Sequence, residues 1–325
     1  MWVAMKAIVV SKHGGPEVLV PSEVNAPTPS DSEVLVAVDV AGVNFIDVYF
    51  REGVYPHELP LTPGFEGTGR VLHDPRGEIA DGTLVAWCDA FGSYAEQVCV
   101  PRDRLVAVPE QVKPEVAASM LLQGITAHYL TDGVFPLQEG QICLLTAGAG
   151  GVGLLATQMA KARGARVISV VSTDDKEALA REAGADHVLR YGDDLADRVR
   201  ALTDRRGVDV VYDGVGKDTF QHSLDAVRTR GTVCLFGAAS GPVEPLDPQE
   251  LNAHGSIFLT RPSIGAWTSE PGEFAYRGQA VVQMIVDGTL DVRVGAEFDL
   301  DDAAVAHREL EQRRTTGSVV LRVSK

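Results

Sequence analysis

The clearest chemical signal in the sequence lies in the six residues from 148 to 153, which read Gly-Ala-Gly-Gly-Val-Gly. They satisfy the G-x-G-x-x-G pattern, with an apolar run before them and a helical pattern after them. Backbone without β-carbons can approach a pyrophosphate closely, and the following helix offers free N–H groups and a partial positive charge. The alternative is that the glycines only allow a helix to pack tightly on a sheet. The pattern predicts a dinucleotide site formed by Gly148, Gly150, Gly151, Val152 and Gly153.

The residues after the second predicted strand indicate which dinucleotide binds. A site that prefers NAD usually carries Asp or Glu here, about 20 residues beyond the glycines. In this chain the strand ends at Ser172, whose hydroxyl does not repel a 2′-phosphate, and Lys176 follows one helical turn later. This arrangement favours NADP. Asp174 and Asp175 count against it unless they cap a helix and point to solvent, and Lys176 could itself be an ordinary solvated residue.

A doubly wound α/β domain must position these residues. From about residue 140, short apolar runs alternate with helical stretches, which is typical of a parallel sheet covered by helices. The helix after the glycines has a predicted core-facing stripe of Val152, Leu155, Ala156, Met159 and Ala160. The expected strands are Ile142–Thr146, Arg166–Val171, His187–Leu189, Val208–Tyr212, Thr232–Phe236 and Ser256–Leu259.

The N-terminal part of the chain has a different, β-rich character. Residues 33–40 alternate with period two, which places Val34, Val36, Val38 and Val40 on one face of a strand. Dense glycine and proline punctuation around this strand predicts a compact antiparallel domain. After about residue 260, two helical segments and a final strand at Ser318–Val323 could rejoin this domain.

The composition describes an ordinary globular protein of about two domains. The chain has 325 residues, of which 45% are hydrophobic and 23% charged. A net charge of −16 has the wrong sign for binding a nucleic-acid backbone, so no nucleic acid partner is expected. Four scattered cysteines without a C-x-x-C pair favour the reducing cytoplasm and predict no metal cluster. No secretory signal is recognisable and glycines interrupt the one long uncharged stretch, residues 140–160, so no membrane partner is expected.

Motifs for hydrolysis and phosphoryl transfer are missing from the sequence. No G-x-S-x-G segment is present, and His57-Glu58 is not followed by the second His of a zincin. What is left is a dinucleotide site joined to a second domain. Hydride transfer needs little else, because the cofactor carries the chemistry and the protein supplies position and electrostatics. The residues therefore favour an oxidoreductase.

Six groups of residues, in their order along the chain, are specific together although each is weak alone. They are Ala41–Asp47 with Tyr49, Arg51, Gly53 and Tyr55; Pro63–Gly67; Gln123–Ala127; the glycine loop; Asp213–Gly216; and Thr260–Ser263. Over nearly the whole chain, they resemble the zinc-free quinone oxidoreductases (zeta-crystallin type) of the medium-chain dehydrogenase/reductase superfamily. The resemblance implies a GroES-like β-rich catalytic domain over residues 1–120 and 260–325, and a Rossmann dinucleotide-binding domain over residues 121–259.

The resemblance also bears on metal chemistry. Zinc-dependent relatives carry a Cys in the segment that here reads Gly42-Val43-Asn44, and a His beside the Glu that is here Glu66. Val43, Asn44 and Phe65 cannot act as those ligands, so no metal is expected. Without a Lewis acid, alcohol oxidation is disfavoured, whereas a quinone is already a strong electrophile.

The resemblance assigns roles to individual residues. It places Asn44 and Tyr49 as catalytic residues, and Tyr55 and Thr126 as substrate-binding residues, because their polar groups can donate to an oxygen that gains charge. Asn44 with Asp47 also looks like a helix cap, and both tyrosines could simply pack in the core. For the cofactor, the resemblance assigns Ser172, Lys176, Tyr191 and Arg313 to the 2′-phosphate end and Phe236 and Gly237 to the nicotinamide end.

The expected function is that of a cytoplasmic, zinc-independent NADPH:quinone oxidoreductase that transfers a hydride directly to a small-molecule quinone. Two alternatives are an NADPH-dependent reductase of α,β-unsaturated carbonyls and a non-catalytic NADPH-binding protein. The apolar edge strand at residues 256–259 would be costly to leave unpaired, and relatives pair it across a two-fold axis. A homodimer is therefore expected.

Overall fold

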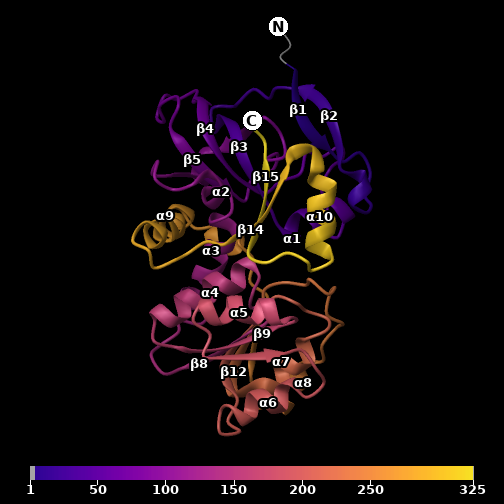
Figure 1. The fold of residues 1–325 in the computed structure, drawn as a ribbon, viewed down its shortest axis with the longest axis vertical. Coiled ribbons are helices and arrows are strands. Elements are labelled where there is room, and N and C mark those ends of the chain that lie inside the picture. Colours follow the sequence, from indigo (N-terminus) through magenta and orange to yellow (C-terminus); the bar gives the residue numbers. More distant parts are fainter. Residues whose placement is uncertain (1–3, 325) are drawn as a thin grey trace. The chain divides into compact units, whose positions relative to one another are not determined.

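A computed structural model describes residues 4–324, which form two compact units (Figure 1). The first unit, which we call the GroES-like unit, contains residues 4–125, 268–286 and 292–324 of the described chain. The second, the Rossmann unit, contains residues 126–267 and 287–291. The domain boundaries near residues 120 and 260 stay a prediction. No helix within residues 4–324 is both long enough and apolar enough to cross a membrane.

The Rossmann unit is built on a six-stranded parallel sheet in the order β10-β9-β8-β11-β12-β13. Its strands are β8 (Ile142–Leu145), β9 (Arg166–Val171), β10 (His187–Arg190), β11 (Val208–Asp213), β12 (Val227–Leu235) and β13 (Phe258–Thr260). Its helices are α4 (Gly151–Ala162), α5 (Asp174–Glu182), α6 (Leu195–Ala201), α7 (Phe220–Ala226) and α8 (Pro248–Ala253). In Figure 1, α4 and α5 cover one face, and α6, α7 and α8 cover the other. The predicted doubly wound α/β fold is confirmed.

Two predicted strand boundaries in this sheet are wrong. The last strand begins at Phe258 instead of Ser256, because Gly255 and Ser256 have φ angles of 94° and 56°, which an extended strand does not allow. The strand before it begins at Val227, five residues earlier than predicted. Its first half is irregular, with Arg230 at φ 56° and a register shift against β11, so no apolar run marks it in the sequence.

The stripe predicted for α4 is largely confirmed. Leu155, Ala156, Met159 and Ala160 are buried, whereas Val152 is only half-buried. Leu154 and Thr157 are buried as well. The helix is thus covered on more than one face, as expected for a helix packed on a sheet and against neighbouring helices.

The GroES-like unit contains a mostly antiparallel seven-stranded sheet and a separate β1-β2 pair. The sheet order is β14-β15-β3-β4-β5-β7, with β6 paired to β3, and only β14 and β15 run parallel. The strands are β1 (Ala4–Val9), β2 (Val20–Asn25), β3 (Glu33–Val43), β4 (Glu66–His73), β5 (Leu84–Cys88), β6 (Gln97–Pro101), β7 (Leu105–Ala107), β14 (Val294–Asp299) and β15 (Ser318–Arg322). In β3 the predicted alternation is confirmed, with Val34, Val36, Val38 and Val40 buried.

The helices of the GroES-like unit within the described residues are α1 (Phe45–Glu52), α2 (Pro114–Ala117), α9 (Glu273–Val286) and α10 (Ala303–Glu311). Of the predicted site residues, Tyr49 lies in α1 and Asn44 directly precedes it. A further helix, α3 (Leu121–His128), crosses the boundary between the units and continues as a π-helical turn over Tyr129–Val134.

A buried arginine fixes α1 against α10. Arg51 is fully buried, donates to the Gly14 carbonyl at 3.0 Å and pairs with Glu311. It also donates to His307 Nδ1 at 3.1 Å, so His307 carries its hydrogen on Nε2, 3.1 Å from the Tyr94 hydroxyl. Burial, helped by the Arg51 charge, lowers the pKa of His307 to about 3. The neutral imidazole therefore holds one hydrogen-bonding pattern throughout the ordinary pH range.

Candidate functional site

The glycine loop connects β8 to α4, and its glycines serve different purposes. A β-carbon on Gly148 would lie 1.6 Å from Ser169 Oγ, and one on Gly153 would lie 2.4 Å from the Ala147 carbonyl oxygen. Neither position has room for a side chain. A β-carbon on Gly150 would meet only the Ala147 carbonyl oxygen, at 3.2 Å. Gly148 and Gly153 therefore permit packing, as the alternative interpretation proposed, whereas Gly150 keeps a space open beside the backbone.

This open space lies at the N-terminus of α4. Gly150 is extended, the helix begins at Gly151, and no side chain of residues 4–324 caps it. The N–H of Leu154 donates to the Gly150 carbonyl at 2.9 Å. The preceding N–H groups, of residues 151–153, have no acceptor within the helix. These groups and the helix dipole suit an anion, so a dinucleotide pyrophosphate fits the loop.

A buried carboxylate fixes the edge of the sheet at which the loop lies. Asp213, the last residue of β11, is fully buried. Its donors are Thr146 Oγ1 (3.0 Å), Val215 N (2.9 Å), Gly216 N (3.1 Å), Thr219 Oγ1 (2.8 Å) and Ser223 Oγ (2.7 Å). The carboxylate thus joins the ends of β8 and β11 to α7.

Three residues predicted for the 2′-phosphate end lie near this edge. Ser172 is exposed directly after β9, and Lys176 is half-buried in the first turn of α5. Tyr191 follows β10, and its hydroxyl accepts the Ala147 N–H of the glycine loop at 2.8 Å. Tyr191 is therefore in direct contact with the loop. The roles of these residues toward a phosphate stay predictions.

The structure adds a cation that the sequence reasoning missed. Arg190 ends β10 and is paired in register with Val171, the residue before Ser172. It binds Asp174 at 2.6 Å and Glu177 at 2.8 Å, so the exposed carboxylate of Asp174 has a cationic partner. Arg190 Nη1 is buried and has no hydrogen-bond partner within residues 4–324. The sequence did contain a signal for this cation. Arg190 is a basic residue at the end of β10, and β10 pairs with β9, the strand that precedes Ser172.

Phe236 and Gly237 follow β12 at the same edge of the sheet. Their N–H groups donate to the Asp213 carbonyl at 2.9 and 3.3 Å. A β-carbon on Gly237 would lie 2.4 Å from the Gly214 carbonyl oxygen, so this position requires glycine. The Phe236 carbonyl accepts from Arg261 Nη1 at 2.9 Å. The backbone of both residues is therefore fixed, as a contact with a flat ring requires.

In the GroES-like unit, Asn44 lies within a buried polar chain. Its Nδ2 donates to Glu66 Oε2 at 3.0 Å, and its Oδ1 accepts from Gln123 Nε2 at 3.2 Å. Gln123 Oε1 accepts from Ser318 Oγ at 2.7 Å, and Glu66 Oε1 accepts from the Leu122 N–H at 2.8 Å. Burial raises the pKa of Glu66 to about 8, although the hydrogen bonds from Leu122 and Asn44 oppose the rise.

Glu66, Gln123 and Ser318 received no role from the sequence. The first two lie in segments that carried the family resemblance, Pro63–Gly67 and Gln123–Ala127, which was the available signal. Ser318 lies on the final strand and carried no signal. The chain of hydrogen bonds brings all three to Asn44.

The capping interpretation of Asn44 is correct for its backbone only. The Asn44 N–H donates to Asp47 Oδ2 at 2.9 Å, and Gly53, at φ 78°, ends α1. The Asn44 side chain is used instead for Glu66 and Gln123. Burial raises the pKa of Asp47 to about 7, and its Oδ1 has no hydrogen-bond partner within the described chain. The capping bond therefore fixes the backbone of Asn44, and the polar chain fixes its side chain.

Tyr49 and Tyr55 belong to a group of rings that we call the aromatic cluster. Its members are Phe45, Tyr49, Phe50, Tyr55, His57, Phe65 and Phe91. The rings of Tyr49 and Tyr55 are 5.3 Å apart in an edge-on arrangement. Phe65 is buried and His57 is exposed, while the other rings are half-buried. The tyrosines thus pack against other rings and remain partly accessible, so core packing does not exclude a binding role.

Thr126 and Arg313 complete the predicted set. Thr126 lies in α3 and is 8% exposed. Arg313 follows α10 with φ 58°. Thr126 belongs to the Rossmann unit and Arg313 to the GroES-like unit, and the roles of both stay predictions.

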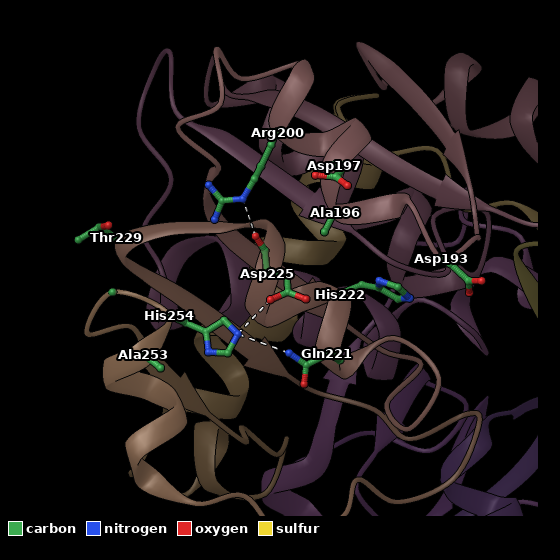
Figure 2. A pocket seen from close by; sticks show the side chains of 11 residues that line it. Asp193, Ala196, Asp197, Arg200, Gln221, His222, Asp225, Thr229, Ala253 and His254 are labelled. Atoms are coloured by element: carbon green, nitrogen blue, oxygen red, sulfur yellow. Dashed lines mark hydrogen bonds and ion pairs between the residues drawn. The ribbon is translucent and has the colours of Figure 1, made fainter.

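A pocket of about 540 Å³ on the Rossmann unit contains none of the predicted residues (Figure 2). Arg200 Nε in this pocket donates to the Asp225 carbonyl at 2.7 Å. His254 Nε2 lies 3.0 Å from Asp225 Oδ1, and its Nδ1 lies 2.7 Å from the Glu250 carbonyl. These polar groups satisfy one another, so they stabilise helix ends and do not form a candidate site.

Within residues 4–324, no group of three or more His, Cys, Asp or Glu side chains is placed to hold a metal ion. Val43 is buried in the core of the GroES-like unit. Phe65 packs against Phe50 and Phe91 in the aromatic cluster. Val43, Asn44 and Phe65 therefore offer neither a thiolate nor an imidazole at the segments in which zinc-dependent relatives carry ligands.

Comparisons with known proteins agree with this architecture. Residues 30–110 match the family described as alcohol dehydrogenase GroES-like domain, and residues 151–279 match the family described as zinc-binding dehydrogenase. A quinone oxidoreductase of Pseudomonas aeruginosa is 39% identical over 97% of this chain and 99% of its own. A 2-haloacrylate reductase of Burkholderia is 36% identical over 97% and 98%. The solved structure of a mycobacterial protein complexed with NADPH has a TM-score of 0.96 and 47% identity, covering 98% of this chain and all of that one.

The different surroundings of the glycines lead to a prediction. Gly150→Ala is expected to keep the fold and to weaken NADPH binding about tenfold or more, because its methyl group enters the open space beside the helix terminus. Gly148→Ala is expected to lower the free energy of unfolding by about 1–3 kcal/mol through overpacking. Fluorescence titration and urea unfolding measure the two effects.

Gly265→Ala is the matched control, because a β-carbon at Gly265 meets nothing within 4 Å. It should change neither NADPH binding nor unfolding. Unaltered NADPH affinity in Gly150→Ala would contradict the assignment of this space to the cofactor.

Proposed function

The chain belongs to the zeta-crystallin-type quinone oxidoreductases of the medium-chain dehydrogenase/reductase superfamily, and we propose on this premise that it is an NADPH-dependent quinone reductase. NADPH, when bound, supplies a hydride. The quinone also takes up one proton, which gives the hydroquinone. The observation that carries the proposal is an amide donor, Asn44, directly preceding a helix that contributes three rings to the aromatic cluster. This combination suits a flat ring that bears a reducible oxygen.

The Rossmann unit supplies the cofactor contacts in this proposal. The N–H groups at the start of α4 bind the pyrophosphate, with Gly150 providing the space. Ser172, Lys176 and Tyr191 receive the 2′-phosphate, and the family resemblance assigns Arg313 to the same group. Phe236 and Gly237 present fixed backbone to the nicotinamide ring. An acidic protein can hold the anionic cofactor because these contacts are local.

The GroES-like unit supplies the substrate contacts. Tyr49 and Tyr55 offer aromatic rings and hydroxyl groups. The family resemblance assigns the Thr126 hydroxyl to the substrate as well. The Asn44 amide donates to the quinone oxygen as negative charge develops on it. The hydrogen bonds to Glu66 and Gln123 set the orientation of the Asn44 amide.

The proposed reaction requires no metal. A quinone carbonyl is electron-poor enough to accept hydride without a Lewis acid, in contrast to the carbonyl formed by an alcohol dehydrogenase. The absence of a thiol or an imidazole from Val43, Asn44 and Phe65 supports this zinc independence. The match to a zinc-binding dehydrogenase family covers residues 151–279, which do not include these positions.

Reduction of an activated carbon–carbon double bond is the second candidate function. The similarity to a 2-haloacrylate reductase favours it, because that relative covers the chain almost completely. The same hydride and the same amide donor would serve an α,β-unsaturated carbonyl, in which charge also develops on an oxygen.

A substrate panel separates the two functions. Stopped-flow oxidation of NADPH should be fast with 1,4-benzoquinone and a naphthoquinone, and at least about tenfold slower with an enone, an alkenal or a 2-haloacrylate. Dialysis against EDTA should leave the quinone rate unchanged. Faster reduction of the unsaturated carbonyls would establish the second candidate, and tight NADPH binding without turnover would indicate a non-catalytic protein.

Cofactor preference tests the role of Lys176. A charge-assisted hydrogen bond contributes about 1.5–3 kcal/mol, so Lys176→Ala should lower kcat/KM for NADPH about 10- to 100-fold and leave that for NADH unchanged. Arg181→Ala is the matched control, because Arg181 lies on the same helix and pairs with Glu177 at 2.7 Å. Equal losses with both cofactors, or no loss with NADPH, would refute the role of Lys176.

We further propose a homodimer that works in the cytoplasm, where its four free cysteines would stay reduced. The outer strand β13 exposes 64% of Phe258, and pairing with the same strand of a second copy would cover it. Light scattering should give about twice 34.7 kDa. Phe258→Lys should shift the mass toward the monomer, whereas Tyr276→Lys, at a residue 59% exposed on α9, should not. A monomeric wild type would disprove the dimer.

A further inference from the structure

The buried chain of Ser318, Gln123, Asn44 and Glu66 has a single direction. Each side chain donates to the next, from the Ser318 hydroxyl to the Glu66 carboxylate. Both Glu66 oxygens act only as acceptors, since Oε1 faces the Leu122 N–H and Oε2 faces Asn44 Nδ2. All four side chains are at most 8% exposed, so water does not replace a lost partner. This pattern corresponds to an ionised Glu66.

A proton added to Glu66 would reverse the direction of every hydrogen bond between these four side chains. It must go to Oε2, because Oε1 accepts the Leu122 N–H. Asn44 Nδ2 cannot accept a hydrogen bond, so its amide would have to turn over and present Oδ1. Gln123 would then turn over in the same way.

The reversed chain would end at Ser318, whose hydroxyl can accept a hydrogen bond as well as donate one. Each of the three side-chain contacts would again join a donor to an acceptor, and the Ser318 O–H would turn away from Gln123. The chain thus has two arrangements in which all three contacts are hydrogen bonds, while any mixture of the two places donor against donor or acceptor against acceptor. The Asn44 backbone stays in place in both, because its N–H is bonded to Asp47 Oδ2 at 2.9 Å.

The two arrangements differ in what Asn44 offers to a bound molecule. In the ionised arrangement, Nδ2 uses one hydrogen for Glu66, and no side chain in the described part of the chain accepts the other. In the reversed arrangement, a lone pair of Oδ1 replaces that hydrogen. A substrate oxygen that gains negative charge is stabilised only by the ionised arrangement, in which Asn44 presents a hydrogen.

We propose that Glu66 is a positioning residue whose ionisation, transmitted through Asn44 and completed by Gln123 and Ser318, decides whether Asn44 presents a donor to the substrate oxygen. The consequence for catalysis rests on the proposed quinone reduction, whereas the two arrangements of the chain do not. Glu66 lies against the backbone of strand β3. A β-carbon on the neighbouring Gly42 would lie 2.8 Å from Oε2, so the carboxylate packs directly on that backbone.

The ionisable groups that face Glu66 in the described chain are Asp47 from α1 and Cys88 from β5. Strand β3 and helix α3 contribute amide and backbone groups. Burial raises the pKa of Glu66 to about 8, and the charge of Asp47 adds to the rise. Glu66 is therefore mostly protonated below about pH 8 and ionised above it. The donor form of Asn44 should accordingly gain population as the pH rises through this value.

Two measurements on the full-length protein test the arrangements without substrate. Infrared difference spectra between about pH 6 and 10 should show a buried carboxylic acid that ionises near pH 8, and this signal should be absent in Glu66→Gln. Nuclear magnetic resonance of ¹⁵N-labelled side-chain amides should show Asn44 and Gln123 changing together with the same midpoint. A Glu66 that stays ionised, or amides that do not respond, would overturn the proposal.

Kinetics then test the consequence. The amide that Glu66→Gln introduces can donate to Asn44 Oδ1 while accepting the Leu122 N–H, so this substitution should fix the reversed arrangement. We expect kcat for a naphthoquinone to rise through about pH 8 in the wild type. In Glu66→Gln it should be at least about tenfold lower, without this pH dependence, while KM for NADPH is unchanged.

A double-mutant cycle distinguishes positioning from a merely structural role. If Glu66 acts through Asn44, then Glu66→Gln should cause no further loss in an Asn44→Ala background. Additive losses, or a pH dependence near 8 that persists in Glu66→Gln and so belongs to Asp47, would overturn the proposal. A wild type that reduces no quinone at any pH but shows the spectroscopic transitions would refute the proposed function and leave the two arrangements intact.

Discussion

A carboxylate that is removed from water needs hydrogen-bond donors around it, and this requirement organises both units of the protein. In the Rossmann unit, Asp213 collects hydroxyl and backbone donors from β8, α7 and the turn between β11 and α7. In the GroES-like unit, Glu66 collects the Leu122 N–H and the Asn44 amide. Each carboxylate thereby fixes the positions of segments that are distant in sequence, and the residues proposed to bind cofactor and substrate lie on or next to those segments.

The two carboxylates differ in the kind of donor that surrounds them. Backbone N–H groups of Val215 and Gly216 cannot reverse their direction, so Asp213 has one arrangement. Glu66 is bonded on one side to an amide, which can present either a donor or an acceptor after a half-turn. A fixed anchor suits the unit that must hold a rigid phosphate loop, whereas a reversible one suits a position where charge changes during a reaction.

Much of the fold was predictable from the sequence, because it depends on local spacing. The glycine loop, the alternation of β3 and the alternating strands and helices follow from periods of two and 3.6 residues. The errors occurred where backbone geometry broke the period, at Ser256 with φ 56° and at Arg230 with φ 56°. Two residues of the proposed site, Gly150 and Ser172, could be named in the same way, because the motif predicts their spacing.

By itself, then, the sequence determined that this protein carries a dinucleotide loop on a parallel sheet and belongs to one family of oxidoreductases. Only the tertiary structure decided which polar groups meet. Ser318 and Gln123 are 195 residues apart and lie on a strand and a helix, yet share a buried hydrogen bond of 2.7 Å. Arg190 and Phe91 likewise acquire their neighbours only from strand register and ring packing. The physical reason is that hydrogen-bond partners of buried side chains depend on how distant segments cross, which no local period records.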